Sequence, residues 1–301
     1  EISEMNALFG YSNADYNPFF TDEHLRCTSP SLDNLGFYVE IDEDFFGNPR
    51  SNTAPDIGAH EYSSDPSLTP LAGNYDIGSG GDFASINDFA LALAQRGVSA
   101  AVTGLLNDAS YSEQIVFDRI PGSGHDRIVT LKGNLTTYPT ISYSSQNAIN
   151  NYVLATYRSK YLRFEQISFD TQAQSYSNIL VMNGFAQSIS FLWCNFNAPS
   201  GLTGNNCNSI SSTDYQGTSD LSLVACLFDG NSNGANLNGE DLVISNCTFR
   251  NMNIGISLSQ VDDPRIDGNL LENISNTAIS INSIRNGDIF YNRILSMYRG
   301  L

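Results

Sequence analysis

The segment Leu192–Phe196 reads Leu-Trp-Cys-Asn-Phe and recurs along the second half of the chain with apolar residues at matching positions. Two repeats read Val-Ala-Cys-Leu-Phe at Val224–Phe228 and Ser-Asn-Cys-Thr-Phe at Ser245–Phe249. The last apolar residue of each repeat forms a series: Phe169, Phe196, Phe228, Phe249, Leu271 and Ile294. Its final three steps are 21, 22 and 23 residues. A period of this size indicates stacked units, each of which buries its apolar face against its neighbours.

The repeated segments predict strands rather than helix pairs, because they are short and rich in aromatic and β-branched residues. A second repeated segment, at Gly255–Leu258 and Ala278–Ile281, supplies another strand in each unit. The position two residues before each aligned apolar residue is occupied in turn by Ile167, Cys194, Cys226, Cys247, Asn269 and Asn292. We predict that the cysteines of this column pack as small apolar side chains. We predict that its asparagines hydrogen-bond between neighbouring units.

On these repeats, residues 161–301 resemble right-handed parallel β-helix proteins of the pectin-lyase-like superfamily. The resemblance implies an all-β chain with one continuous core, and it specifies the fold far better than an activity.

The first 62 residues carry different motifs, which follow in the order Asn17–Phe20, Thr28–Asp33, Asp44–Arg50 and Pro55–Tyr62. This order resembles the closing segment of bacterial extracellular β-helix domains. We therefore predict that residues 1–62 close a preceding β-helix and that residues 63–70 form a polar linker containing proline. Residues 71–301 would then be the cap and first coils of a second β-helix, in a chain that is a fragment of a longer tandem array.

A capping helix is predicted from Ser85 to about Arg96, because Phe83, Ile86 and Phe89 begin an apolar face at helical spacing. Ser85 and Asp88 form a capping box, and Gly97 marks the end of the helix. Such a helix covers the open end of a β-helix. This start of a module resembles those of large surface and secreted proteins of Bacteroidota-type bacteria.

The charge of the chain limits its partners. The formal net charge is −18, with 14 basic and 32 acidic residues. An acidic chain does not suit nucleic acid, which binds through lysine and arginine. No apolar run reaches the ~20 residues of a membrane span, so we expect no membrane insertion. The carboxylates are compatible with calcium, and no other cofactor is expected.

An acidic column precedes the aligned apolar residues by eight positions, at Asp220, Asp241 and Asp263, and continues at Asn286. Stacking would place these residues on neighbouring strands, ~4.8 Å apart. Three interpretations stay open: the aspartates form turns, they bind calcium, or they catalyse. The catalytic alternative centres on Asp241, Asp262 and Asp263 and resembles polygalacturonase-type glycosidases, although Arg285-Asn286-Gly287 stands where that family has Gly-His-Gly.

A lyase would instead use Lys160 as its base, beside Arg158 and Arg163. The repeat puts Lys160 at least three coils from Asp241, so these groups are not expected to share one groove. Our leading hypothesis is therefore a non-catalytic structural or adhesive segment, secreted or at the cell surface. Its expected partners are extracellular polysaccharide, which it would bind, and neighbouring modules of the same large protein. The alternative is a polysaccharide lyase or glycoside hydrolase.

Overall fold

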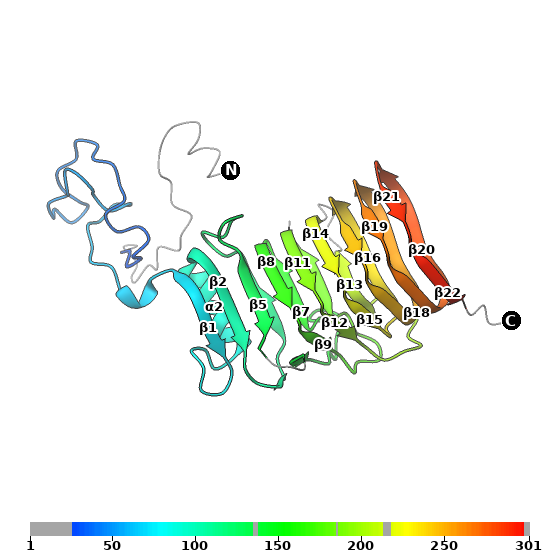
Figure 1. Cartoon of the computed structure of the whole chain (residues 1–301). Helices are drawn as coiled ribbons and strands as arrows, with labels where there is room; N and C mark the ends of the chain where they lie inside the picture. Colours follow the sequence, from blue (N-terminus) through cyan, green and yellow to red (C-terminus); the bar gives the residue numbers. More distant parts are fainter. Residues whose placement is uncertain (1–25, 135–137, 185, 213–217, 298–301) are drawn as a thin grey trace.

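The computed structural model describes residues 26–134, 138–184, 186–212 and 218–297. From Leu71 onward the chain winds into coils that stack in one direction, from β1 at one end to β22 at the other (Figure 1). Successive coils pair in parallel throughout the described stack. The predicted all-β parallel β-helix is confirmed. The predicted Asn17–Phe20 motif lies outside the described residues.

Three rows of parallel strands run along the stack. The first row consists of β1 (Leu71–Ile77), β2 (Val98–Leu106), β5 (Val129–Gly133), β8 (Lys160–Glu165), β11 (Gln187–Leu192), β14 (Thr218–Val224), β17 (Val243–Ser245), β19 (Arg265–Asp267) and β21 (Asp288–Phe290). The second row consists of β3 (Ser110–Tyr111), β6 (Thr140–Ser142), β9 (Ser168–Asp170), β12 (Asn195–Asn197), β15 (Leu227–Asp229), the first parts of β18 (Thr248–Asp262) and β20 (Leu270–Arg285), and β22 (Arg293–Met297). The third row consists of β4 (Ile115–Phe117), β7 (Leu154–Tyr157), β10 (Leu180–Asn183), β13 (Asn208–Ser212), β16 (Asn233–Glu240) and the later parts of β18 and β20.

The predicted capping helix is also confirmed, as α2 (Ile86–Arg96) beside the first coil. Ser85 is its N-cap and accepts a hydrogen bond from the Asp88 backbone N–H. Gly97 ends the helix with a φ of 70°, which glycine adopts without strain. Only a short 3-10 helix, η1 (Pro66–Leu68), precedes β1 among the described residues. No helix in the described ranges has the length and apolar character needed to cross a membrane.

From β8 onward, two corners of each coil pass through the left-handed backbone region. The first corner lies in the first three residues of the first-row strand or two residues before it, and is formed by Tyr161, Ser188, Asp220, Asp241, Asp263 and Asn286. The second corner, between the first and second rows, is formed by Gln166, Trp193, Ala225, Asn246, Gly268 and Tyr291. All of these residues have a positive φ. Glycine, asparagine and aspartate visit this region most readily, and they occupy six of these twelve corner positions.

The aligned phenylalanines form one continuous stack inside the coils. Phe169 and Phe196 lie 5.4 Å apart between ring centroids, Phe196 and Phe228 4.8 Å, and Phe228 and Phe249 4.4 Å. All four are 0% exposed. A phenylalanine that recurs once per coil in the sequence thus forms a stacked aromatic column in the core.

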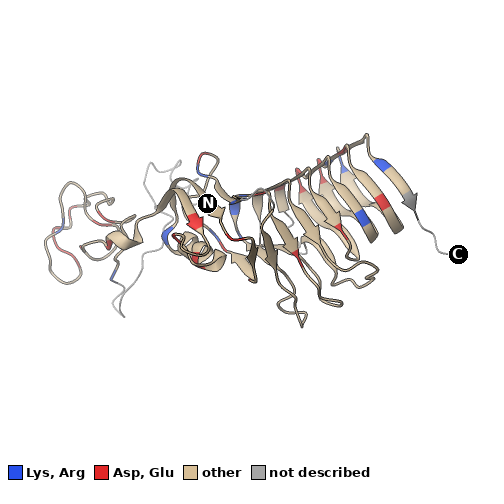
Figure 2. Ribbon diagram, turned by 60° about the horizontal axis from the view of Figure 1, so that its bottom comes forward, with Lys and Arg blue, Asp and Glu red and all other residues tan. Residues whose placement is uncertain are grey.

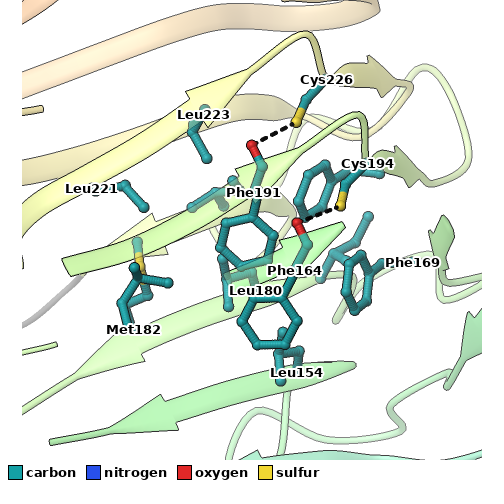
Figure 3. Packing of buried hydrophobic residues seen from close by; sticks show 14 of the residues in the cluster. Leu154, Phe164, Phe169, Leu180, Met182, Phe191, Cys194, Leu221, Leu223 and Cys226 are labelled. Carbon is teal, nitrogen blue, oxygen red and sulfur yellow. Dashed lines mark hydrogen bonds between the residues drawn. The ribbon is translucent and has the colours of Figure 1, made fainter. Parts of the chain in front are cut away.

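The neighbouring column of cysteines and asparagines links one coil to the next. Figure 3 shows the Cys194 and Cys226 thiols donating to the backbone carbonyls of Phe164 and Phe191 in the preceding coil. Asn269 Nδ2 donates in the same way to the Ile244 carbonyl, at 2.8 Å. The predicted amide bonding is confirmed, since Asn269 Nδ2 also donates to Asn292 Oδ1 at 2.9 Å. The cysteines of this column are buried, and none of them forms a disulfide.

Residues 26–65 fold around buried carboxylates. The Asp44 side chain accepts hydrogen bonds from the backbone N–H groups of Phe46, Asn48 and Glu61. Arg50 lies 3.2 Å from Glu61 and also donates to the backbone carbonyl of Asp56. These contacts explain why the Asp44–Arg50 and Pro55–Tyr62 motifs occur together. Whether this segment closes a preceding β-helix stays a prediction.

Candidate functional site

The predicted acidic column, Asp220, Asp241 and Asp263, lies on the first corner. Continued two residues before the paired strands, the register aligns Asp220 with Asp241, Asp241 with Asp263, and Asp263 with Asn286. Figure 2 shows acidic residues repeated from coil to coil along one edge of the stack. These three aspartates are exposed and have φ values between 50° and 56°. The left-handed backbone accounts for aspartate and asparagine at this corner without any ligand, and so favours the turn-forming interpretation.

Asp262, the third residue of the predicted catalytic set, is paired with an arginine. Arg285 Nε donates to Asp262 Oδ1 at 2.7 Å, and the second guanidinium nitrogen contacts Oδ2. These hydrogen bonds lower the pKa of Asp262, and the nearby positive charge adds to the effect. A glycosidase acid needs a carboxyl that stays protonated, so Asp262 is in the wrong environment for that role.

The predicted lyase base does not approach these carboxylates. Lys160 pairs with Gln187, Gln187 with Ser219, and Ser219 with Glu240, so three strand spacings separate Lys160 from the coil of Asp241. At ~4.8 Å per spacing, the separation is roughly 14 Å. No group of three His, Cys, Asp or Glu residues in the described ranges is arranged to hold a metal ion. Calcium binding at Asp220, Asp241 and Asp263 therefore stays a prediction.

The N-terminus of α2, which follows the glycine-rich segment Gly78–Gly81, does not provide a free anion site. The Glu113 carboxylate accepts hydrogen bonds from the backbone N–H groups of Ile86 and Asn87, at 3.2 Å and 3.0 Å. A helix N-terminus attracts anions through these N–H groups. Here a side chain of the chain itself fills that position.

A polar pocket of about 480 Å³ lies on the outer face of the second row. Hydroxyl groups come from Ser112, Thr140, Ser142 and Ser144. The other lining side chains are Tyr143, Asp170 and Gln172. These residues lie on or directly after β3, β6 and β9, so consecutive coils build the pocket. We call this site the second-row pocket.

Asp170 is the charged residue of the second-row pocket, and one of its oxygens is held firmly. Oδ1 accepts a hydrogen bond from Ser168 Oγ at 2.8 Å and another from Asn197 Nδ2 at 2.8 Å. Asn197 Nδ2 also lies 2.9 Å from Ser168 Oγ, which makes the three side chains a closed triangle. Oδ2 receives no hydrogen bond from the described residues. The carboxylate is thus oriented and keeps one oxygen available to a donor on a ligand.

The polar row continues beyond the pocket. The register aligns Asp170 with Asn197, Asn197 with Asp229, and Asp229 with Arg250. Arg250 donates to Asp229 Oδ2 through two nitrogens, at 3.0 Å and 2.7 Å, and Asn251 donates to Oδ1 at 2.7 Å. Because protein donors already bind both oxygens of Asp229, this carboxylate stabilises the row and is not open to a ligand.

Reading the sequence alone missed this site, although a signal for it was present. Asp170, Asn197, Asp229 and Arg250 each follow an aligned phenylalanine directly. Successive residues of a strand point to opposite faces, so a polar residue after each buried phenylalanine must face outward. The column eight positions before each aligned apolar residue is acidic in three successive coils, whereas this row mixes acidic, amide and basic side chains and so has a less evident pattern.

Comparison with known proteins supports the fold. No protein-family model matches the chain. No curated protein matches it either. A pectin methylesterase from Aspergillus niger aligns with 79% of this chain and 93% of its own, at 16% identity and a TM-score of 0.44. A GH136 lacto-N-biosidase from Eubacterium ramulus aligns with 74% of this chain at 8% identity and a TM-score of 0.50.

This chain covers 56% of that lacto-N-biosidase. At 8% identity the likeness to the lacto-N-biosidase concerns the fold alone. Shared architecture does not transfer an activity, so function must be argued from the site itself.

Proposed function

We propose that the chain is a carbohydrate-binding β-helix module whose ligand lies along the outer face of the second row. The observation that carries the proposal is the second-row pocket, where one oriented carboxylate, Asp170, is surrounded by hydroxyl and amide groups. Sugar hydroxyls both donate and accept hydrogen bonds. A mixed set of acceptors and donors on rigid strands suits them, because side chains that are already ordered lose little conformational freedom on binding.

The proposed role is non-catalytic. Hydrolysis by an inverting or retaining mechanism needs two carboxyl groups that both reach the substrate. In this row Asp170 keeps one oxygen available, while Arg250 and Asn251 occupy both oxygens of Asp229. The name of one structural neighbour, a lacto-N-biosidase, is consistent with a carbohydrate ligand. We further propose an extracellular or cell-surface setting, with neighbouring modules of the same large protein as partners.

Isothermal titration calorimetry with a panel of soluble polysaccharides tests the proposal. Asp170→Ala should weaken binding roughly 10- to 100-fold, the usual loss for a hydrogen bond to a charged group. Asp241→Ala removes an exposed carboxylate from the first corner and serves as the matched control, which should bind as the unmodified chain does. The proposal fails if no polysaccharide binds, or if both variants bind equally well.

A parallel assay of reducing ends and unsaturated products addresses the enzymatic alternative. Under the proposal, no product accumulates with or without added calcium. Turnover that disappears in Asp241→Asn or Asp263→Asn would instead favour a hydrolase or lyase acting at the first corner.

A further inference from the structure

Trp193 is the single tryptophan of the chain and lies on the side of the stack with half of its surface exposed. It occupies the second corner, between β11 and β12, two residues before Asn195. In the described β-helix, three other large apolar side chains are at least as exposed as Trp193. They are Ile149 in a loop, Leu91 on α2 and Tyr291 at the last coil. Isolated apolar residues on a surface are common, so exposure alone means little.

The backbone conformation makes Trp193 unusual. Its φ is 54°, in the left-handed region that bulky side chains avoid. Four of the five other coils place a small or amide-bearing residue at the same corner, namely Gln166, Ala225, Asn246 and Gly268, and the last coil places Tyr291 there. Tryptophan here is strained and also exposes an apolar ring to water. Neither the turn nor the core requires it, which points to a role outside the fold.

The position of Trp193 relates it to the second-row pocket. Asn197, four residues further along the same coil, donates to Asp170. At ~3.3 Å per residue, the backbone at Trp193 is on the order of 10–13 Å from that contact, within the span of a short oligosaccharide. The strand that follows Trp193 carries two partly exposed amide side chains, Asn195 and Asn197. An aromatic ring therefore lies at one side of a polar strip and an oriented carboxylate at the other.

We propose that Trp193 is a stacking platform for one pyranose ring of a neutral oligosaccharide whose hydroxyl groups bind at Asp170. The inference rests on the proposed carbohydrate binding and names the ligand class. An aromatic face packs against the C–H groups of a sugar ring, while the polar strip binds its hydroxyls. A neutral ligand is expected because the outward positions of the second row contain Asp170, Asp229 and Glu272 against Arg250 and Arg293, and the whole chain carries a net charge of −18. Polyuronates would be repelled.

Tryptophan fluorescence reports on this position alone. The full chain is titrated with cellohexaose, mannohexaose and hexagalacturonate, and fluorescence and calorimetry are followed together. We expect a neutral hexaose to change the emission with the same midpoint as the calorimetric binding curve. Hexagalacturonate should bind more weakly than that neutral ligand.

Trp193→Asn is the informative variant, because Asn246 already occupies the same corner of another coil. It should keep or raise the melting temperature while weakening binding roughly 3- to 10-fold, the loss expected for a stacked aromatic contact. Trp193→Phe should retain part of the affinity. Leu91→Ala truncates a comparably exposed apolar side chain on α2 and should bind as the unmodified chain does.

The outcomes separate this inference from the proposed function. Calorimetric binding without a fluorescence change, and unaltered in Trp193→Asn, would overturn the stacking role and leave carbohydrate binding intact. Tighter binding of hexagalacturonate would overturn the neutral ligand class. Absence of calorimetric heat with every glycan would overturn the proposed function, and this inference with it.

Discussion

Replacing Asn269 tests whether the inner column of cysteines and asparagines stabilises the stack. Asn269 is 1% exposed. Its Oδ1 accepts from the Cys247 backbone N–H at 2.8 Å, and its Nδ2 donates to the Ile244 carbonyl at 2.8 Å. Asn269→Ala leaves that N–H and that carbonyl buried without partners. Each unsatisfied buried group costs ~1–3 kcal/mol, so the variant should lose about 2–6 kcal/mol of unfolding free energy.

The column itself supplies a graded second variant. Cys247 performs both functions one coil earlier: its sulfur accepts from the Cys226 backbone N–H and donates to the Leu223 carbonyl, both at 3.4 Å. Asn269→Cys should therefore be less destabilising than Asn269→Ala. Asn282→Ala removes an exposed amide from β20 and is the control, with an expected change within ~0.5 kcal/mol.

Equilibrium urea unfolding followed by circular dichroism measures all three variants. We expect the order of stability to be Asn282→Ala, then Asn269→Cys, then Asn269→Ala. If Asn269→Ala lies within ~0.5 kcal/mol of the unmodified chain, the column does not carry the coil-to-coil bonding argued here. Equal losses in Asn269→Cys and Asn269→Ala would refute the equivalence of thiol and amide.

Three further predictions concern the core, the N-terminal segment and the first corner. Phe228→Ala should cost ~3–5 kcal/mol in the same urea experiment, because it opens a cavity in the aromatic stack; a loss below ~1 kcal/mol would show that the coils repack freely. Burial alone would raise the pKa of Asp44, but hydrogen bonds from the Asn48 side chain and from nearby backbone N–H groups bring it down to about 2. Since this is below the ~3.9 of an unfolded aspartate, the stabilisation is present above about pH 4 and is lost as the pH falls toward 2. Asp44→Asn should therefore lower the melting temperature at pH 7 but not near pH 2, and an equal deficit at both pH values would contradict this. Asp241→Gly and Asp263→Gly should leave the melting temperature unchanged or higher, with or without calcium, because glycine suits a left-handed corner; a calcium-dependent melting temperature lost in either variant would favour the metal interpretation.

Much of the fold was readable from the sequence for a simple reason. A stacked coil repeats the same environment every 21 to 23 residues in its regular part, so buried phenylalanines such as Phe228 and Phe249 recur in register. The helix at Ser85 was predictable because its cap, its apolar face and its final glycine are all local signals. The position of the acidic column on neighbouring coils was also predictable, because its spacing follows the same period.

The second-row pocket depended on tertiary structure. Asp170 and Asn197 are 27 residues apart in sequence, and only the stacking of β9 on β12 brings their side chains within 2.8 Å. Whether an outward aspartate is open to a ligand depends on the donors beside it, as the contrast between Asp170 and Asp229 shows. The strain at Trp193 was hidden as well, because a backbone angle is not visible in the residue type. The sequence by itself determined the repeating core, since burial imposes a period along the chain. The site depends on contacts between coils, and the partners and distances of those contacts follow from how the coils stack.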